Sequence, residues 1–422
     1  MRTCITSLVA LGAALVLGGT ALAQTEIRVT HSMSGGSNRA AFDAIVDAFE
    51  ASHPDITVKQ IVFDDDLYSD TGLITQLQSS EVPDIYFQWA GFPVQRDADA
   101  GYARDLSDVL GEGDWRDSFS ESVWTEGAGT MVNGDPYIVP ISLDVTNTIW
   151  YNTDIFAEYG IEAPATWDDF VSLVKTLADA GETPIIEGNN ELWPLGNWAS
   201  HIASRVVPPA EYEAAFSQEG PFNTPGFLRA LELLEELHDA GGFNRDMPGL
   251  GADPAMAGFF QGAAAMHPIG SWLVGSAAEL AEDDFNYDQF DTPIIDDSHP
   301  LKDSVIGTAT GFIIHARAEH PDEAIEFLKF FTAPEQQKLW AESGSLSPVA
   351  GVNETADLDP KTASVAALFA EAGSIVPPPD TTYPVPVAEA YYQAAAYVAS
   401  GEKSPEDALT WLDETIAVIG QQ

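Results

Sequence analysis

The sequence predicts an α/β fold with open, mostly parallel sheets, arranged in two domains. Near the N-terminus, apolar segments of strand length alternate with segments of helical periodicity, an order that places a helix between successive parallel strands. No cysteine follows Cys4, so packing rather than disulfide bonds must hold the fold. A chain of 422 residues is long enough to bury the cores of two domains.

Residues 1–23 have the features of a secretory signal peptide. Arg2 supplies a positive charge, Leu8 to Leu17 form an apolar run without a charge, and Ala21-Leu22-Ala23 is a small-residue cleavage site. The apolar run is shorter than the roughly 20 residues of a membrane span. Cys4 precedes the run, which is not where a lipoprotein cysteine lies. We therefore expect cleavage near Ala23 and a soluble periplasmic protein that is not a lipoprotein.

The first domain is predicted to open with three parallel strands separated by two helices. Strands are expected at 25–31, 56–63 and 84–89, where apolar and β-branched residues dominate. Apolar residues from Ala41 to Phe49 recur at helical spacing, and a second helix is expected at 67–78.

The rest of the chain contains one long strand and several helices. Tyr137 to Tyr151 is rich in strand-forming residues and is expected to cross between the domains, and residues 291–311 are expected to be strand and loop. Thr166 is predicted to cap a helix. Further helices are expected at 225–240, from Pro321 to Glu342 with a break at Pro334, at 387–400 and at 405–419, and a surface crossing at 377–386.

The charge balance excludes two classes of partner. The chain has 17 Lys and Arg against 66 Asp and Glu, a net charge of −49. Such a surface repels nucleic acid and anionic lipid headgroups. The acidic residues are spread along the chain, which favours a role in solubility, as in a saline habitat.

Patterns of catalytic and metal sites are missing from the sequence. The histidines form no H-x-x-x-H pair, Asp64-Asp65-Asp66 is not followed by EF-hand spacing, and no G-x-S-x-G occurs. We therefore expect neither an enzyme nor a metal, and no cofactor.

A series of short motifs, in order along the chain, resembles the extracellular solute-binding proteins of ABC importers, in the branch of maltose-binding and related sugar-binding proteins. The motifs are residues 29–37, Pro83-Asp84-Ile85-Tyr86, Tyr137-Ile138-Val139-Pro140, Trp150-Tyr151-Asn152, Thr166-Trp167-Asp168, Ala264-Ala265-Met266, Gly270-Ser271-Trp272 and Gly311-Phe312-Ile313-Ile314.

The resemblance implies two Rossmann-like lobes joined by a hinge that the chain crosses several times, the type II periplasmic binding protein fold. It places 24–142 with 292–343 in lobe 1 and 143–291 with 344–422 in lobe 2, with the ligand in a cleft between them. Open α/β sheets also bind ligands beyond the carboxyl ends of their strands. The implied partners are the permease subunits of an ABC importer with their cytoplasmic ATPase, and the protein itself is expected to be a monomer.

Sugars offer C–H faces and hydroxyl groups, so a sugar site needs aromatic surface and neutral hydrogen-bonding groups. Four tryptophans are predicted to supply the surface, whereas the other six are expected to be packing residues. The predicted ligand-binding residues are Ser34, Gly35, Gly36, Ser37, Asn38, Trp89, Asp144, Thr146, Trp193, Trp198, Gly270, Trp272, Thr308, Thr310 and Gly311.

For the polar members of this set a structural role is an open alternative. Ser34 to Asn38 form a glycine turn at a helix start, which suits oxygen ligands but lacks the motif of a phosphate loop. Asp144 is equally consistent with an ordinary turn, and Thr308, Thr310 and Gly311 with packing at a strand end.

The function predicted is capture of a carbohydrate outside the cytoplasm and its delivery to a permease by hinge closure. A polyamine or a polyol phosphate in the same fold is an alternative, with Arg28, Arg39 or Arg205 available for a phosphate. A secreted glycoside hydrolase is the third, because it also needs tryptophans and two carboxylates.

Overall fold

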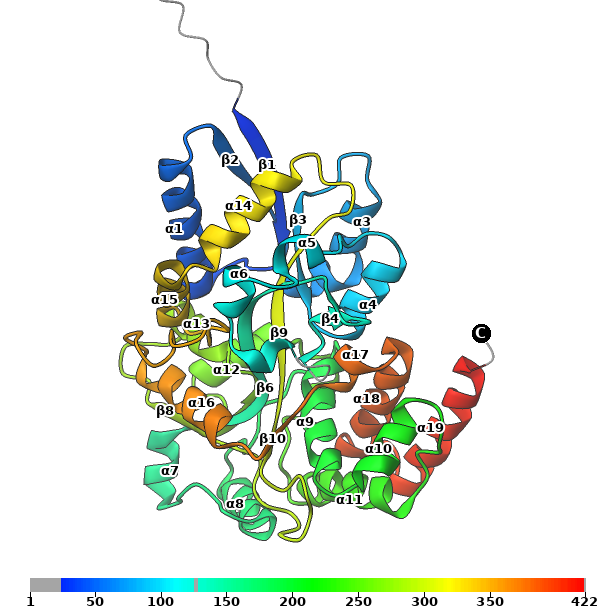
Figure 1. Ribbon diagram of the computed structural model, residues 1–422. Coiled ribbons are helices and arrows are strands. Elements are labelled where there is room, and N and C mark those ends of the chain that lie inside the picture. The colour runs from blue at the N-terminus through cyan, green and yellow to red at the C-terminus, as the bar shows by residue number, and fades with distance from the viewer. Residues whose placement is uncertain (1–23, 125–127, 421–422) are drawn as a thin grey trace, which may run out of the picture.

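The computed structural model describes residues 24–124 and 128–420, so the predicted signal peptide lies outside the described residues. These residues form two lobes that share one sheet (Figure 1). Its strands run in the order β2-β1-β3-β9-β6-β7, with β10 paired to β9 and β8 paired to β6. Within the described residues, no helix is long and apolar enough to cross a membrane.

Lobe 1 is built on β1 (Thr25–His31), β2 (Ile56–Val62) and β3 (Ile85–Trp89), which are parallel as predicted. The helix α1 (Gly36–Ser52) packs its apolar face on this sheet together with α14 (Pro321–Phe331). The helix expected at 67–78 is less regular than predicted. It consists of α2 (Asp65–Leu67), a π-helical turn (Tyr68–Gly72) and α3 (Leu73–Gln78).

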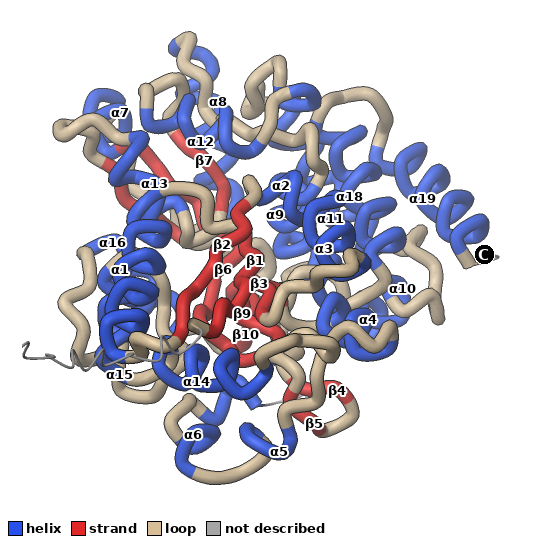
Figure 2. The backbone as a smooth tube through the Cα atoms, turned by 90° about the horizontal axis from the view of Figure 1, so that it is seen from above, coloured by secondary structure: helices blue, strands red, loops and turns tan. Residues whose placement is uncertain are grey.

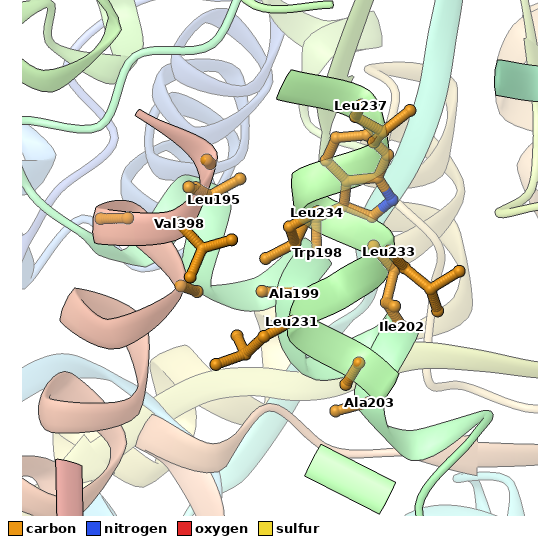
Figure 3. Close-up of a cluster of buried hydrophobic side chains, with 14 of the residues drawn as sticks. Leu195, Trp198, Ala199, Ile202, Ala203, Leu231, Leu233, Leu234, Leu237 and Val398 are labelled. Atoms are coloured by element: carbon orange, nitrogen blue, oxygen red, sulfur yellow. The ribbon is translucent and has the colours of Figure 1, made fainter. Parts of the chain in front are cut away.

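Lobe 2 contains β7 (Met266–Ile269) and β8 (Tyr287–Phe290), both antiparallel to one half of β6. The helix α8 (Trp167–Ala180) begins at the predicted cap, where the Thr166 side chain accepts a hydrogen bond from the Asp169 N–H. Helices α9 (Trp193–Ser204), α11 (Pro225–Asp239), α18 (Val385–Ala399) and α19 (Pro405–Ile419) cover one side of the sheet around a large apolar core (Figure 3).

Shorter elements complete the two lobes. They are α4 (Phe92–Asp99), α5 (Ser107–Leu110), α6 (Asp114–Asp117), β4 (Met131–Val132), β5 (Asp135–Pro136), α7 (Thr153–Tyr159), α10 (Pro209–Phe216), α12 (Ala252–Phe260), α13 (Leu273–Leu280), α15 (Pro334–Glu342), α16 (Pro360–Glu371), β10 (Ser374–Val376) and α17 (Pro379–Thr382).

The lobes are joined by two long strands and a third crossing. Strands β6 (Val139–Asn152) and β9 (Ser304–Ile314) are antiparallel neighbours that run through both lobes. The third crossing follows α15, where Leu143 N–H donates to the Leu346 carbonyl at 2.8 Å. Seen from above, the strands lie between α1, α13 and α15 on one side and α3, α4 and α18 on the other (Figure 2).

The predicted division of the chain between the lobes stays a prediction. Arg205, directly after α9, donates to the Thr292 and Ser304 carbonyls, whereas Val349 and Val352 pack in the core of lobe 1. These contacts favour one boundary between the lobes inside β9 and another after Val352.

The segment expected to be a surface crossing at 377–386 is partly interior. Pro379 and Thr381 of α17 are buried. A Cβ added at Gly91 of lobe 1 would lie 1.9 Å from the Thr381 carbonyl oxygen. Because α17 touches the other lobe through its backbone, it is a contact between lobes rather than a surface strap.

Candidate functional site

The strands that join the lobes bring several predicted residues together. Trp89 at the end of β3 pairs in register with Thr310 of β9. The Thr310 hydroxyl donates to Asp144 Oδ2 at 3.1 Å, and the Trp89 ring lies 5.2 Å from the ring of Phe87. Burial raises the pKa of Asp144 to about 6, and the bond from Thr310 opposes this shift. Trp89 and Asp144 are half-buried, so both lie at the edge of the packed interior.

Two other predicted strand residues have structural contacts. Thr308 lies opposite Asp144, and its hydroxyl donates to the Ala309 carbonyl at 3.3 Å. A Cβ at Gly311 would lie 2.2 Å from the Val139 carbonyl oxygen. Gly311 is therefore required by the close approach of β6 and β9.

Two tryptophans of lobe 2 form an aromatic pair. Trp193 is the first residue of α9, and Trp272 directly precedes α13. Their ring centroids lie 5.8 Å apart, and both side chains are half-buried. A Cβ at Gly270 would lie 1.9 Å from Cζ3 of Trp272, so the Trp272 ring lies directly on the Gly270 backbone. Glycine at 270 thus creates the space that holds an indole at the end of β7.

A buried amide lies beside this glycine, and further unpartnered polar atoms lie elsewhere in the same part of the fold. Thr148 of β6 is paired with Ile269 of β7, and this antiparallel register puts Asn147 beside Gly270. Asn147 is 1% exposed, and neither atom of its side-chain amide has a hydrogen-bond partner among the described residues. The same holds for Oδ1 of buried Asn189 and the hydroxyl of buried Thr146. Buried polar atoms are nearly always bonded, so this group is a place where a ligand or water is expected to bind.

Glu187 belongs to the same region. It follows Ile185, which forms a parallel bridge with Met266 of β7, so Glu187 lies near the carboxyl end of a strand-like segment. Its side chain is fully buried and has no side-chain partner in residues 24–124 and 128–420, although the backbone N–H of Gly188 donates to its carboxyl group. Burial holds the pKa of Glu187 well above its ordinary value.

Asn147 and Glu187 were not predicted from the sequence. Glu187 directly follows Ile185 and Ile186, and Asn147 lies between two threonines in a strand that is otherwise mostly apolar. A polar residue at a strand position that should face a core is the signal that identifies such groups.

The predicted turn at Ser34 to Asn38 is used for contacts between lobes. The Ser37 hydroxyl donates to the Gly275 carbonyl of α13 at 2.9 Å. The Asn38 amide donates to the Ser345 hydroxyl at 3.1 Å and accepts from the Ser343 hydroxyl at 3.2 Å.

Close backbone contacts accompany these hydrogen bonds. A Cβ at Gly36 would lie 2.8 Å from the Gly275 carbonyl oxygen, and one at Gly35 would lie 2.9 Å from Glu279 Oε2. Ser34 is exposed. The turn lies against the helix that starts after Trp272, and the side chains of Ser37 and Asn38 are already bonded.

The prediction that Trp198 binds ligand is wrong. Trp198 is 0% exposed and packs in the core of lobe 2 (Figure 3), with its Nε1–H donating to the Thr292 hydroxyl at 3.2 Å. Trp193 and Trp198, expected from the sequence to lie in a loop with Asn189 and Asn190, both belong to the helix α9. Residues five apart on a helix point in directions about 140° apart, so Trp193 and Trp198 do not face the same side.

The arginines considered for a phosphate are paired with carboxylates. Arg28 is 3.4 Å from Glu81, Arg39 is 2.8 Å from Asp43, and buried Arg205 contacts Asp291. Among the described residues, no group of three or more His, Cys, Asp or Glu side chains could hold a metal ion.

Comparison with known proteins gives a consistent result. Residues 35–338 match the family model of the bacterial extracellular solute-binding protein. The chain is 29% identical over 331 residues to the multiple sugar-binding protein of Streptococcus mutans, covering 75% of this chain and 73% of that protein.

Solved structures resemble the whole molecule. A chitin oligosaccharide binding protein has a TM-score of 0.82 at 23% identity, covering 94% of this chain and 100% of that chain. The solute-binding protein RafE in complex with raffinose has a TM-score of 0.77 at 21% identity, with coverages of 94% and 100%.

Proposed function

Because the chain belongs to the bacterial extracellular solute-binding protein family and has the two-lobed fold of type II periplasmic binding proteins, we propose that it binds a carbohydrate for an ABC importer. One observation carries this proposal. The rings of Trp193 and Trp272 are paired and half-buried, the Trp272 ring lies on Gly270, and the register of β6 and β7 puts the buried, unpartnered amide of Asn147 beside that glycine. Relatives whose names state a sugar ligand support the same conclusion.

The chemistry of this group suits a sugar ring. Indole faces pack against the C–H faces of pyranose rings, and amides both donate to and accept from hydroxyl groups. Trp89 and Asp144, on the strands that join the lobes, would add a further aromatic surface and an acceptor. A dissociation constant near 1 μM corresponds to about 8 kcal/mol, which a few such contacts can supply.

Binding would act through the two crossing strands and the third crossing. Ligand contacts from both lobes favour the closed form over the open form, so capture is a shift of the hinge equilibrium. The closed form would then dock on the permease subunits, whose ATPase lies in the cytoplasm. We propose a periplasmic monomer that is cleaved near Ala23, is not a lipoprotein, and binds its ligand without turning it over.

Calorimetry with a panel of mono- and oligosaccharides tests the proposal. We expect at least one saccharide to bind and to raise the melting temperature of the protein. Stabilisation by another class of solute, and by no saccharide, would contradict it. Turnover of chromogenic glycosides would favour a hydrolase instead.

A second test identifies the ligand directly. Protein purified without denaturation is expected to retain its ligand, which mass spectrometry of the released small molecules would identify as a saccharide. Release of a polyamine or a polyol phosphate would favour one of those alternatives.

A further inference from the structure

We propose that Tyr392 is a positioning residue, which holds Trp193 of lobe 2 and Trp89 of lobe 1 in the relative arrangement that binds the ligand. The inference rests on the carbohydrate function proposed above and adds a residue that lies outside the candidate site. It is carried by a continuous series of direct contacts that connects the two tryptophans through α17.

The lobe 1 end of this series lies two residues after Trp89. A Cβ at Gly91 would lie 1.9 Å from the Thr381 carbonyl oxygen, and the φ of Gly91 is +95°. The Gly91 N–H also donates to the Gly129 carbonyl at 2.7 Å. A side chain at position 91 would therefore separate α17 from lobe 1. Since α17 packs against both α4 and α18 (Figure 1), it links this backbone of lobe 1 to the helices of lobe 2.

Tyr392 of α18 connects α17 to α9. The Asp380 N–H of α17 donates to the Tyr392 hydroxyl at 3.4 Å, and this hydroxyl donates to Asn197 Oδ1 at 3.2 Å. The ring lies on the backbone of Gly196, because a Cβ there would lie 2.2 Å from Cγ of Tyr392. Gly196 and Asn197 follow Trp193 by three and four residues, so all three share one face of α9. Tyr392 therefore contacts α9 one turn after Trp193.

The burial of Tyr392 shows how it can act. Its side chain is 1% exposed, so its hydroxyl influences binding through the elements that it joins. Hydrogen bonds are directional, and the two bonds of this hydroxyl fix α17 against α9 more narrowly than apolar packing alone. A ligand held between the lobes then meets Trp89 and Trp193 in an arrangement that is already organised, which lowers the cost of binding.

The neighbouring Tyr391 is a matched control. It is equally buried, and its hydroxyl donates to the Ala199 carbonyl of α9 at 3.3 Å. Both tyrosines thus connect α18 to α9 through a hydroxyl. Of the two, only Tyr392 is bonded to α17 among the described residues.

Two phenylalanine variants test the role of the Tyr392 hydroxyl. Tyr392→Phe keeps the ring on Gly196 and removes both bonds, so we expect the affinity for the tightest-binding saccharide of the panel to fall about three- to tenfold. Tyr391→Phe should keep the affinity within about twofold of the unmodified protein. Both variants lose buried hydrogen bonds, so both melting temperatures should fall, and lost stability alone does not account for a difference in affinity.

A double-variant cycle with Trp89 supplies a measurement that a purely structural role would not change. If Tyr392 acts by placing Trp89 against the ligand, its substitution has little left to disturb once residue 89 is alanine. We therefore expect Tyr392→Phe to change the affinity by less than about twofold in the Trp89→Ala background. A purely structural role would give the same loss in both backgrounds.

A second measurement needs no ligand. The sequence has no cysteine after Cys4, so spin labels can be attached at two introduced cysteines alone. Asp99→Cys at the end of α4 and Glu414→Cys on α19 replace exposed residues of the two lobes. We expect Tyr392→Phe to broaden the distribution of distances between the labels, and Tyr391→Phe to leave it unchanged.

The outcomes separate the inference from the proposed function. Equal losses of affinity in the two tyrosine variants, or a loss for Tyr392→Phe that persists in full without Trp89, overturn the positioning role and leave carbohydrate binding intact. Failure of every saccharide to bind contradicts the proposed function, and the label distances then test the positioning role alone. A distribution that Tyr392→Phe leaves unchanged overturns that role.

Discussion

Trp272 follows the end of β7, its ring lies on the backbone of Gly270, and its side chain is half-buried rather than fully buried. Its substitution by alanine is expected to weaken binding of the best saccharide in the panel by about 1–2 kcal/mol, or roughly five- to thirtyfold. The melting temperature should change little, because part of the ring is already exposed. Calorimetry and thermal melting of the variant measure the two quantities separately.

Trp198 is the matched comparison for this variant. It lies entirely in the core of lobe 2, so Trp198→Ala should cost about 3–5 kcal/mol of folding stability. A Trp272→Ala variant that lost stability and kept its affinity would instead identify Trp272 as a packing residue.

Glu187 makes the stability of the protein depend on pH. Burial raises its pKa above the ordinary value of 4.5, so the folded state holds a proton that the unfolded state has released. Stability should therefore fall as the pH rises from about 4.5 through the raised pKa. Glu187→Gln removes this loss and should stabilise the ligand-free protein by about 1–3 kcal/mol at neutral pH.

Thermal melting of both proteins across the pH range measures this difference. The gain should vanish at acid pH, where Glu187 is protonated in both states. A constant difference at every pH, or destabilisation by glutamine at neutral pH, would show that the carboxylate is compensated in the folded protein.

Part of the candidate site could be predicted from the sequence, for a physical reason. Trp272 follows a glycine after a strand, and Trp89 ends a strand, so both lie where parallel sheets present ligands. Asn147 and Glu187 were missed because their importance depends on register. Only the packing of the folded chain shows that both side chains are buried without a side-chain partner.

At the scale of elements, α1 and α13 meet at a junction of three glycines, Gly36, Gly275 and Gly344. A Cβ at Gly275 would lie 2.8 Å from Asn38 Oδ1, and one at Gly344 would lie 3.0 Å from the Gly275 nitrogen. The junction thus joins lobe 1, lobe 2 and the third crossing at backbone distance.

Gly275→Ala is expected to push these elements apart and to favour the open form. The closed form would keep its affinity, but fewer molecules would be closed, so the measured binding would be weaker. A shift of about 0.7–1.4 kcal/mol in the free-energy difference between the open and closed forms weakens binding about three- to tenfold. Small-angle scattering should show a larger radius of gyration without ligand. Gly249→Ala, where a Cβ would meet nothing within 4 Å, is the control, and equal affinities of the two variants would contradict the expectation.

The helices and strands with strong periodicity were predicted correctly, and the errors share a cause. The helix α9 was missed because Pro194, Gly196 and Asn197 are typical of loops. Proline is favourable in the first turn of a helix, where its missing N–H is not needed. The remaining apolar residues of α9 pack on α11 and α18, and this tertiary packing overrides the weak local preference.

The molecule as a whole carries a net charge of −49, which bears on stability more than on recognition. Its arginines and lysines are mostly engaged in ion pairs with neighbouring carboxylates, such as Arg104 with Asp108 and Lys175 with Asp179. The large excess of carboxylates therefore has no matching positive charge in the chain. Self-repulsion of this kind destabilises the compact state, and salt screens it, with a Debye length of about 10 Å at 0.1 M and about 3 Å at 1 M.

We therefore expect the melting temperature to rise steadily with potassium chloride between about 0.1 and 1 M, because screening acts on the many exposed carboxylates of the folded chain. Thermal melting at each salt concentration measures this trend. A melting temperature that is constant or falls with salt would show that the acidic surface is already compensated.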